Sequence, residues 1–180
     1  AGSNYDSVFA VILGTGVGAG FSLNKKIIVG PNKLTGEWGQ NPIPGPMDDY
    51  EKNVKRHCGR IGAIEVFLSG PGLENYYRYK TNSKKTSKEI VTLFNENNAH
   101  ALEVMDMYFE RIARSFSTFV NILDPDIIVC GGGMSEIDNI YDEIPKRIIP
   151  YIASNFFLTP IVKAKHGSSS GVRGAAHLWN

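Results

Sequence analysis

The sequence predicts an α/β fold: a mixed sheet that opens with an antiparallel meander and is flanked by helices. One observation is an apolar run of strand length, Ser7 to Leu13, that stops at a glycine and is followed by a second run, Phe21 to Leu23. Another is a long amphipathic stretch from Ala99 to Leu123. The third is a β-branched run, Asp126 to Cys130, that leads directly into three glycines. Such strand-to-helix junctions are typical of open α/β sheets.

Composition restricts the classes of function. The chain has 180 residues, 42% of them hydrophobic, which suits one globular domain with a real core. A formal net charge of +1 gives no field that would gather nucleic acid or an anionic membrane, so neither is expected as a partner. No apolar run approaches the length of a membrane span. Two cysteines, Cys58 and Cys130, build neither a disulfide framework nor a four-cysteine metal site, and a reducing, cytoplasmic location is expected.

The first third of the chain reads as strands followed by a loop. Asn24 to Lys26 predicts a turn between the Phe21 to Leu23 run and a third short strand, Ile27 to Val29. From Gly30 to about Arg60 the chain is rich in Gly, Pro and Asn, which predicts an extended loop. Loops of this length inside compact domains are usually functional or disordered.

Helices dominate the middle of the chain. Ile61 to Leu68 and Gly72 to Tyr79 are expected to be helical, and Ser87 is expected to cap a short helix that runs to about Asn95. In the Ala99 to Leu123 helix one apolar stripe recurs at spacings of three and four: Leu102, Met105, Phe109, Ile112, Phe116, Phe119 and Leu123.

The end of the chain returns to strand and helix. A further helix is expected from near Ser135, and a last strand from Pro160 to Ala164. A terminal helix through Leu178 follows a serine run.

A first glycine segment, Gly14 to Gly20, lies between two predicted strands and so differs from a dinucleotide fingerprint, which opens a helix. Glycines let the backbone approach a ligand, and successive N–H groups can point at an anion, while Thr15 adds a hydroxyl. Gly14, Thr15, Gly16 and Gly18 are therefore candidate nucleotide-binding residues. The alternative is a glycine-rich hairpin that merely turns.

The second glycine segment is Gly131, Gly132 and Gly133, followed by Met134 and Ser135. Three consecutive glycines carry a large entropic cost on folding, which a plain turn rarely needs. Ligands of open α/β sheets gather at such carboxyl ends of strands. Two glycine junctions, one suited to phosphates and one able to admit a flat base, suggest a nucleotide held between them.

Three segments carry a resemblance to a known family: Gly36 to Pro44, His57 to Glu65, and Leu68 to Gly72. With Asn121 to Asp126, Gly131 to Ser135 and Lys165 to Ala176, they resemble the ROK family of sugar kinases and sugar-responsive repressors, and within it the bacterial fructokinase or mannokinase branch. The resemblance covers essentially the whole chain. It implies an actin-like (RNase H-like) domain that uses ATP and Mg²⁺, with Gly14 to Gly20 near the phosphates and Gly131 to Gly133 near adenosine.

The resemblance also implies sugar contacts. It assigns two carboxylates, Glu37 and Glu65, to sugar hydroxyls, and a carboxylate can accept two such hydrogen bonds. The family's zinc site uses a histidine at the position of Gln40 and cysteines at the positions of Arg56, Cys58 and Ala63. Only Cys58 matches, and one thiolate cannot hold a structural zinc, so Zn²⁺ is expected to be absent. Gln40 can still offer a donor and an acceptor to the sugar.

The resemblance further implies a division of the enzyme into halves. The family's kinases carry a first phosphate motif and the catalytic aspartate in an amino-terminal half, and neither matches the stretch from Ala1 to Asp6. We therefore expect residues 1–180 to form a single C-terminal ROK-type domain, with no catalytic residue of their own and the base upstream of Ala1. This fragment alone is expected to be inactive.

The leading hypothesis is accordingly the nucleotide- and sugar-contacting domain of an ATP-dependent hexose kinase, most like fructokinase. One alternative is the sugar-sensing half of a ROK repressor, and another is a degenerate, non-catalytic paralogue. A homodimer is expected because the family commonly dimerises through this half.

Overall fold

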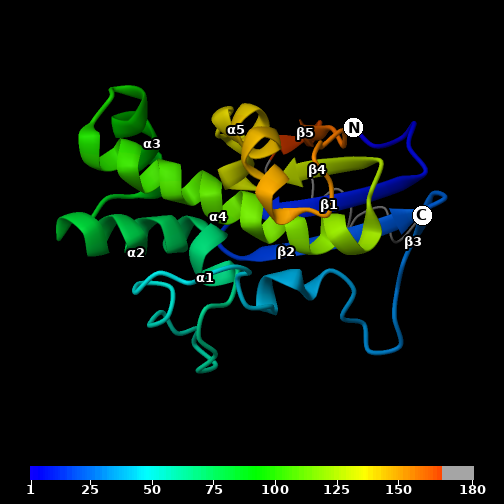
Figure 1. The fold of residues 1–180 in the computed structure, drawn as a ribbon, viewed down its shortest axis with the longest axis horizontal. Coiled ribbons are helices and arrows are strands. Elements are labelled where there is room, and N and C mark those ends of the chain that lie inside the picture. The colour runs from blue at the N-terminus through cyan, green and yellow to red at the C-terminus, as the bar shows by residue number, and fades with distance from the viewer. Residues whose placement is uncertain (168–180) are drawn as a thin grey trace.

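The computed structural model describes residues 1–167 and contains one five-stranded sheet of order β3-β2-β1-β4-β5. Figure 1 shows a long helix, α4, in front of the sheet. Strands β1 and β2 pair antiparallel, whereas β1 pairs parallel with β4 and β4 with β5. The predicted α/β class and the mixed sheet with its antiparallel meander are confirmed.

Strand bounds differ from the prediction in the glycine-rich region. The strands are β1 Ser7–Leu13, β2 Val17–Leu23, β3 Lys26–Ile27, β4 Ile127–Gly131 and β5 Ile161–Lys163. The second strand was expected only from Phe21, but it begins at Val17, because the register pairs Val17 with Leu13 and Gly18 with Ile12. Half of the first glycine segment is therefore strand, and the turn itself is Gly14 to Gly16. The third strand is shorter than expected, and it lies at the edge of the sheet.

The first helices are also displaced from their expected bounds. Helix α1 is only Glu65–Leu68, so the prediction of helix from Ile61 was wrong. Gly62 has a positive φ of 69°, and Ile61 and Ala63 form β-bridges to Lys55 and Pro42, all of which is incompatible with helix. Helix α2, Gly70–Thr81, starts earlier than predicted because the Ser69 hydroxyl caps it by accepting from the Gly72 amide at 3.2 Å.

Helix α3, Ser87–Asn95, was predicted with the wrong cap. Thr86, not Ser87, is the N-cap: its hydroxyl accepts from the Glu89 amide, and the Glu89 carboxylate accepts from the Thr86 amide at 2.8 Å. This capping box leaves the Ser87 hydroxyl free for other contacts.

Helix α4, Ala99–Leu123, has the bounds that the sequence predicts. Its apolar stripe packs on one face of the sheet, where Phe119 stacks on Phe9 with 3.9 Å between ring centroids. Leu102 was expected in the stripe but is 39% exposed, because the smaller Ala101 takes the buried position at the start of the helix. The stripe from Met105 to Phe119 is otherwise buried as predicted.

The remaining helical elements are short. The expected helix near Ser135 is first a 3-10 turn, η2 Gly133–Glu136, and then α5 Asn139–Arg147, followed by η3 Ile149–Tyr151. A further 3-10 turn, η1 Glu37–Gln40, lies within the long loop. The terminal helix predicted through Leu178 lies outside the described residues.

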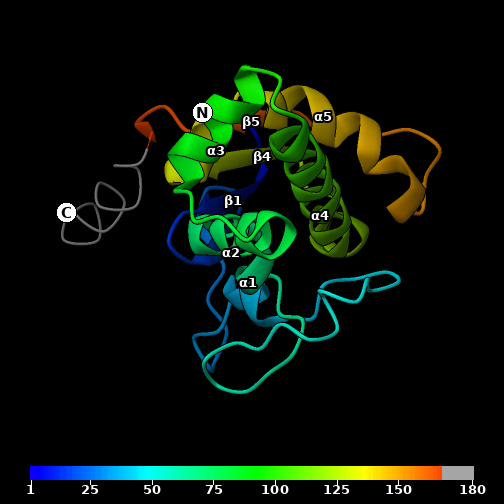
Figure 2. The same ribbon diagram turned by 90° about the vertical axis from the view of Figure 1, so that its left-hand side faces the viewer.

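The long loop between β3 and α1 is ordered by a buried ionic cluster. In Figure 2 this loop extends below β2 and α1. Its Glu51 carboxylate is 1% exposed and accepts from Arg111 Nε at 2.8 Å and from Arg114, both of which belong to α4. The Arg111 guanidinium also lies 4.0 Å from the centroid of the Tyr76 ring on α2. The loop is thus attached to the same helix that supports the sheet.

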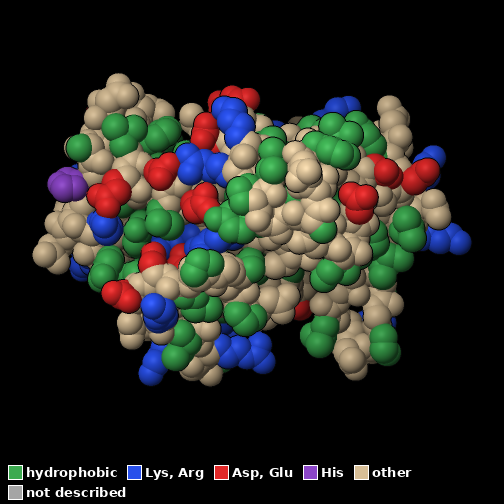
Figure 3. Space-filling model, in the orientation of Figure 1, with side chains coloured by type: hydrophobic (Ala, Val, Ile, Leu, Met, Phe, Trp, Pro, Cys, Tyr) green, Lys and Arg blue, Asp and Glu red, His purple; other side chains and the backbone are tan. Residues whose placement is uncertain are grey.

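The surface is of mixed charge on the face in Figure 3, where acidic and basic side chains are interspersed. Among residues 1–167, no helix is long and apolar enough to cross a membrane.

Hydrogen bonds join Ser7, the first residue of β1, to Asp126, the residue before β4. The Asp126 carboxylate accepts from both the amide and the hydroxyl of Ser7 at 2.8 Å, and these bonds lower the pKa of Asp126. Because the folded state lowers this pKa, the carboxylate's contribution to stability is complete above the ordinary aspartate pKa of about 3.9 and is lost as the pH falls through the folded value.

Asp126→Asn is therefore expected to lower the free energy of unfolding at pH 7, and the gap to the parent chain should narrow as the pH falls below about 3.9. Urea denaturation at a series of pH values measures both. Asp124→Asn is the matched control, because Asp124 is the exposed, left-handed C-cap of α4, where asparagine is well tolerated. A gap that stays constant down to low pH would contradict the ionic role of Asp126.

Candidate functional site

The parallel pairing of β1 with β4 brings the two glycine segments to one edge of the sheet. Ile12 is in register with Gly131, so the turn that follows β1 and the junction that follows β4 leave the sheet side by side. Between them and the N-terminal ends of α2 and α3 lies a cavity of about 840 Å³. Its volume is within the range of small-molecule sites.

The Gly14 to Gly16 turn closes one side of this cavity. The Gly14 amide donates to the Gly16 carbonyl at 3.0 Å, and the Gly14 carbonyl accepts from the Gly70 amide at 2.8 Å, which fixes the turn against α2. Within residues 1–167 the amides of Thr15 and Gly16 have no acceptor. Gly14 and Thr15 line the cavity, and Thr15 is exposed. Two free amides and a hydroxyl in one turn can bind an anion.

The junction after β4 forms the facing wall. Gly132 has a positive φ of 88°, and a Cβ there would lie 2.4 Å from the Leu13 carbonyl oxygen of β1. Only glycine allows the chain to leave the sheet so close to the neighbouring strand. A Cβ on Gly133 would meet no atom within 4 Å. Gly132 and Gly133 both line the cavity, and Gly133 faces open space.

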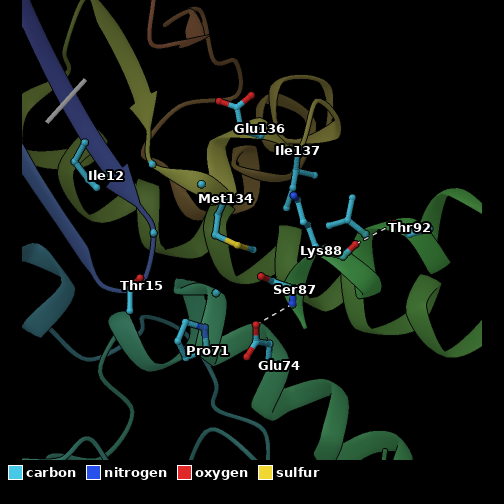
Figure 4. Close-up of a pocket in the computed structure, with 15 residues that line it drawn as sticks. Ile12, Thr15, Pro71, Glu74, Ser87, Lys88, Thr92, Met134, Glu136 and Ile137 are labelled. Carbon is cyan, nitrogen blue, oxygen red and sulfur yellow. Dashed lines mark hydrogen bonds between the residues drawn. The ribbon is translucent and has the colours of Figure 1, made fainter. Parts of the chain in front are cut away.

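Several lining residues were missed by the sequence analysis. Figure 4 shows apolar side chains, Met134 and Ile137, opposite Ser87 and Lys88 at the start of α3. The Glu74 carboxylate of α2 accepts from the Ser87 amide at 2.8 Å and so joins the two helices below the cavity. Met134 and Ile137 follow the second glycine segment in the sequence, whereas only the packing of α2 and α3 brings Ser87 and Lys88 to the glycines. The apolar walls suit a flat ring, and Lys88 gives the rim a positive charge.

Three predicted nucleotide residues do not line the cavity. Gly131 is the buried last residue of β4, and Gly18 lies inside β2. Gly16 belongs to the turn but faces Glu65: a Cβ there would lie 3.0 Å from Glu65 Oε2. For these three glycines a direct role with nucleotide stays a prediction.

A second cavity, of about 830 Å³, contains two of the predicted sugar residues. Glu37 and Gln40 line it together with Asn41, Arg60 and several apolar side chains. The 3-10 turn that carries them is held against β2, because the Ala19 amide donates to the Gly36 carbonyl at 2.8 Å. The two cavities share strand β1, because Ile12 lines the first and Phe9 lines the second.

The third predicted sugar residue, Glu65, lies beside the glycine turn and lines neither cavity. Its Oε1 accepts from Arg56 Nε at 2.9 Å and its Oε2 accepts from the Val17 amide at 3.2 Å. Glu65 opens α1, and the fully buried Ala63 and Ile64 before it fix its backbone. The carboxylate therefore lies between the loop and the first residue of β2.

The four positions compared with a zinc site do not offer a metal-binding set. Arg56 Nη1 donates to Cys58 Sγ at 3.5 Å, so a cation already occupies the neighbourhood of the thiol. The Arg60 backbone amide and Arg56 lower the pKa of Cys58. In the part of the chain that the structure describes, no group of three or more His, Cys, Asp or Glu residues could hold a metal ion. By contrast, burial raises the pKa of Cys130 to about 12, which makes this thiol inert.

Gly132→Ala is expected to lower the free energy of unfolding by about 1–3 kcal/mol, because alanine is strained at this φ and collides with β1. Gly133→Ala is the matched control and should stay within about 0.5 kcal/mol of the parent chain. Urea denaturation followed by circular dichroism compares them. Equal losses in the two variants would contradict the close approach of Gly132 to Leu13.

Comparisons with known proteins agree with this fold. A family model described as "ROK family" matches residues 1–180. The chain is 39% identical over 176 residues to an N-acetyl-D-glucosamine kinase of Vibrio atlanticus, which covers 96% of the chain and 58% of that relative. Kinases of the same name from Vibrio parahaemolyticus and Yersinia enterocolitica match over 58% and 59% of their length. The chain thus spans less than two thirds of the curated relatives it matches.

Solved structures extend the comparison of folds. A ROK family glucokinase from Streptomyces griseus, in complex with glucose and AMPPNP, superposes with a TM-score of 0.86 at 22% identity and covers 99% of this chain and 62% of its own. A ROK family transcriptional regulator superposes with a TM-score of 0.72 at 18% identity over 89% of this chain and 42% of its own. These likenesses show the actin-like fold expected from the sequence.

Proposed function

Because the chain belongs to the ROK family, we propose that residues 1–180 form the nucleotide- and sugar-contacting domain of an ATP-dependent sugar kinase. The observation that carries the proposal is the cavity between the two glycine segments, with apolar walls on one side and Gly14 and Thr15, from the turn with the free amides, on the other. An adenine ring fits the first environment and a phosphate chain the second. The alternative of a plain glycine hairpin gives no reason for these two environments to meet.

In this proposal the chain binds and orients rather than removes a proton. The turn from Gly14 to Gly16 would hold the phosphates, whose charge a bound Mg²⁺ would screen. Glu37, Gln40 and Glu65 accept hydrogen bonds from sugar hydroxyls. The attacking hydroxyl oxygen bonds to the γ-phosphorus, the bond to the bridging oxygen breaks, and ADP leaves. The proton of the attacking hydroxyl passes to an aspartate that the family resemblance assigns to an N-terminal half.

The curated relatives favour a different sugar substrate from the one that the sequence resemblance suggested. The resemblance suggested fructose, whereas the curated relatives are named N-acetyl-D-glucosamine kinase at 34% to 39% identity. We therefore propose N-acetylglucosamine as the first sugar to test and fructose as its comparison. A sugar-sensing repressor half remains the second candidate, since a regulator shares the fold. The free amides of the Gly14 to Gly16 turn favour the kinase, because a sensor of sugar alone needs no phosphate site.

Isothermal titration of the chain with MgATP tests the proposal, and Gly133→Val sharpens it. A valine at this position enters open space, so the chain should fold normally while the cavity is partly filled. We expect MgATP to bind the parent chain and to bind Gly133→Val at least about tenfold more weakly, a loss of about 1.4 kcal/mol.

Gly133→Ala supplies a graded control with a smaller loss, and thermal unfolding confirms that each variant is folded. N-acetylglucosamine and fructose are then titrated in the presence of AMPPNP, where N-acetylglucosamine should bind more tightly. A parent chain that binds sugar but no MgATP would instead support the repressor half. Equal MgATP affinity in Gly133→Val would place the nucleotide elsewhere.

A further inference from the structure

Arg56 is the residue through which the long loop contacts the glycine turn. It lies in a tight hairpin, where its amide donates to the Arg60 carbonyl and its carbonyl accepts from the Gly59 amide, each at 2.8 Å. The hairpin is closed by the bridge between Lys55 and Ile61. The Arg56 side chain is only 18% exposed, which is low for an arginine on a loop. The backbone therefore holds the guanidinium in a defined place.

The Arg56 side chain is connected to the Gly14 to Gly16 turn through the Glu65 carboxylate. Arg56 Nε donates to Glu65 Oε1 at 2.9 Å, and Glu65 Oε2 accepts from the Val17 amide at 3.2 Å. Val17 is the first residue after the Gly14 to Gly16 turn and the first of β2. The carboxylate also lies against the backbone of Gly16. Arg56, Glu65 and Val17 thus form a continuous chain of hydrogen bonds from the loop to the turn.

Glu65 has no other means of holding this orientation among the described residues. Helix α1 is a single turn without a side-chain cap, and its backbone does not restrain the three torsions of a glutamate side chain. One charged hydrogen bond on Oε1 fixes the carboxylate plane, and Oε2 is then aimed at Val17. Each oxygen keeps a further lone pair, so two acceptor positions remain for hydroxyl groups.

We propose that Arg56 is a positioning residue: it holds the Glu65 carboxylate against the Val17 amide and thereby fixes both the Gly14 to Gly16 turn and the carboxylate that the proposed function assigns to the sugar. The expected effect on nucleotide binding rests on the proposed function, whereas the hydrogen bonds that link Arg56, Glu65 and Val17 need no ligand. Arg56 lines neither cavity, so any effect of its substitution on nucleotide affinity must pass through Glu65. If the Arg56–Glu65 ion pair only attached the loop at the surface, its loss would change the free energy of unfolding and leave nucleotide affinity unchanged.

The test combines a measurement without ligand and one with MgATP, on the whole 180-residue chain. Amide exchange of Val17 followed by NMR reports the linkage, because this amide donates to Glu65. Arg56→Gln should raise its exchange rate by about tenfold and weaken MgATP binding by about fivefold or more. Arg56→Lys retains the charge and should lie between the parent chain and Arg56→Gln on both measurements.

Two further variants separate positioning from a general effect. Lys52→Gln removes a charge from the same loop, where the Lys52 side chain pairs with the exposed Asp49 and with no other carboxylate in residues 1–167, and should change neither measurement. Glu65→Gln should reproduce the effects of Arg56→Gln, and the double variant should be no worse than either single one, because both break the same link. If Arg56→Gln fails to fold, Glu65→Gln and Arg56→Lys still report the linkage.

An unchanged Val17 exchange rate in Arg56→Gln would overturn the inference, as would additive losses in the double variant. A parent chain that binds no MgATP would reject the proposed nucleotide site while leaving the exchange result to decide the linkage. Faster Val17 exchange with unaltered MgATP affinity would also overturn it, because the turn would then not depend on Arg56.

Discussion

The parallel pairing of β1 with β4 is the constraint on which the candidate site depends. It joins residues more than a hundred positions apart in the sequence and sets the turn after Leu13 beside the junction after Gly131. Ser7 and Asp126 fix the register at the opposite ends of the two strands. Because a shift by one residue would turn every side chain to the other face of the sheet, the register fixes the core and the cavity together. Gly132 then allows the chain to leave the sheet against the end of β1.

The elements around the cavity differ in how firmly they are held. Helix α4 packs on the sheet through a stacked aromatic pair and carries two arginines that anchor the long loop through the buried Glu51. Such a buried cluster makes the loop sensitive to the loss of a single partner, since the remaining charges would stay in a place that water does not reach. The loop in turn carries Arg56 and the turn with Glu37 and Gln40. The same helix therefore supports the first cavity through the sheet and the second cavity through the loop.

The sequence predicted structural features whose pattern lies within one segment of the chain, and it missed features that depend on contacts between segments. The periodicity of α4 gave its bounds, and the run of three glycines located one wall of the cavity, because both patterns lie within one segment. The strand register was not local, so β2 was expected four residues too late, and the left-handed Gly62 stopped a helix that composition favoured. Ser87 and Lys88 could not be found, since only packing brings the start of α3 to the glycines. The contact of Glu65 with Val17 likewise depends on the fold.

The central claim is that a nucleotide lies across the sheet edge between the two glycine segments. NMR shift mapping of the chain with AMPPNP and Mg²⁺ tests this most directly, because it needs neither turnover nor a sugar. We expect the largest shifts on the amides of Thr15 and Gly16 and on Gly133, Met134 and Ser87, with little change in the second cavity around Gln40. Shifts concentrated around Gln40, or none at saturating nucleotide, would contradict it.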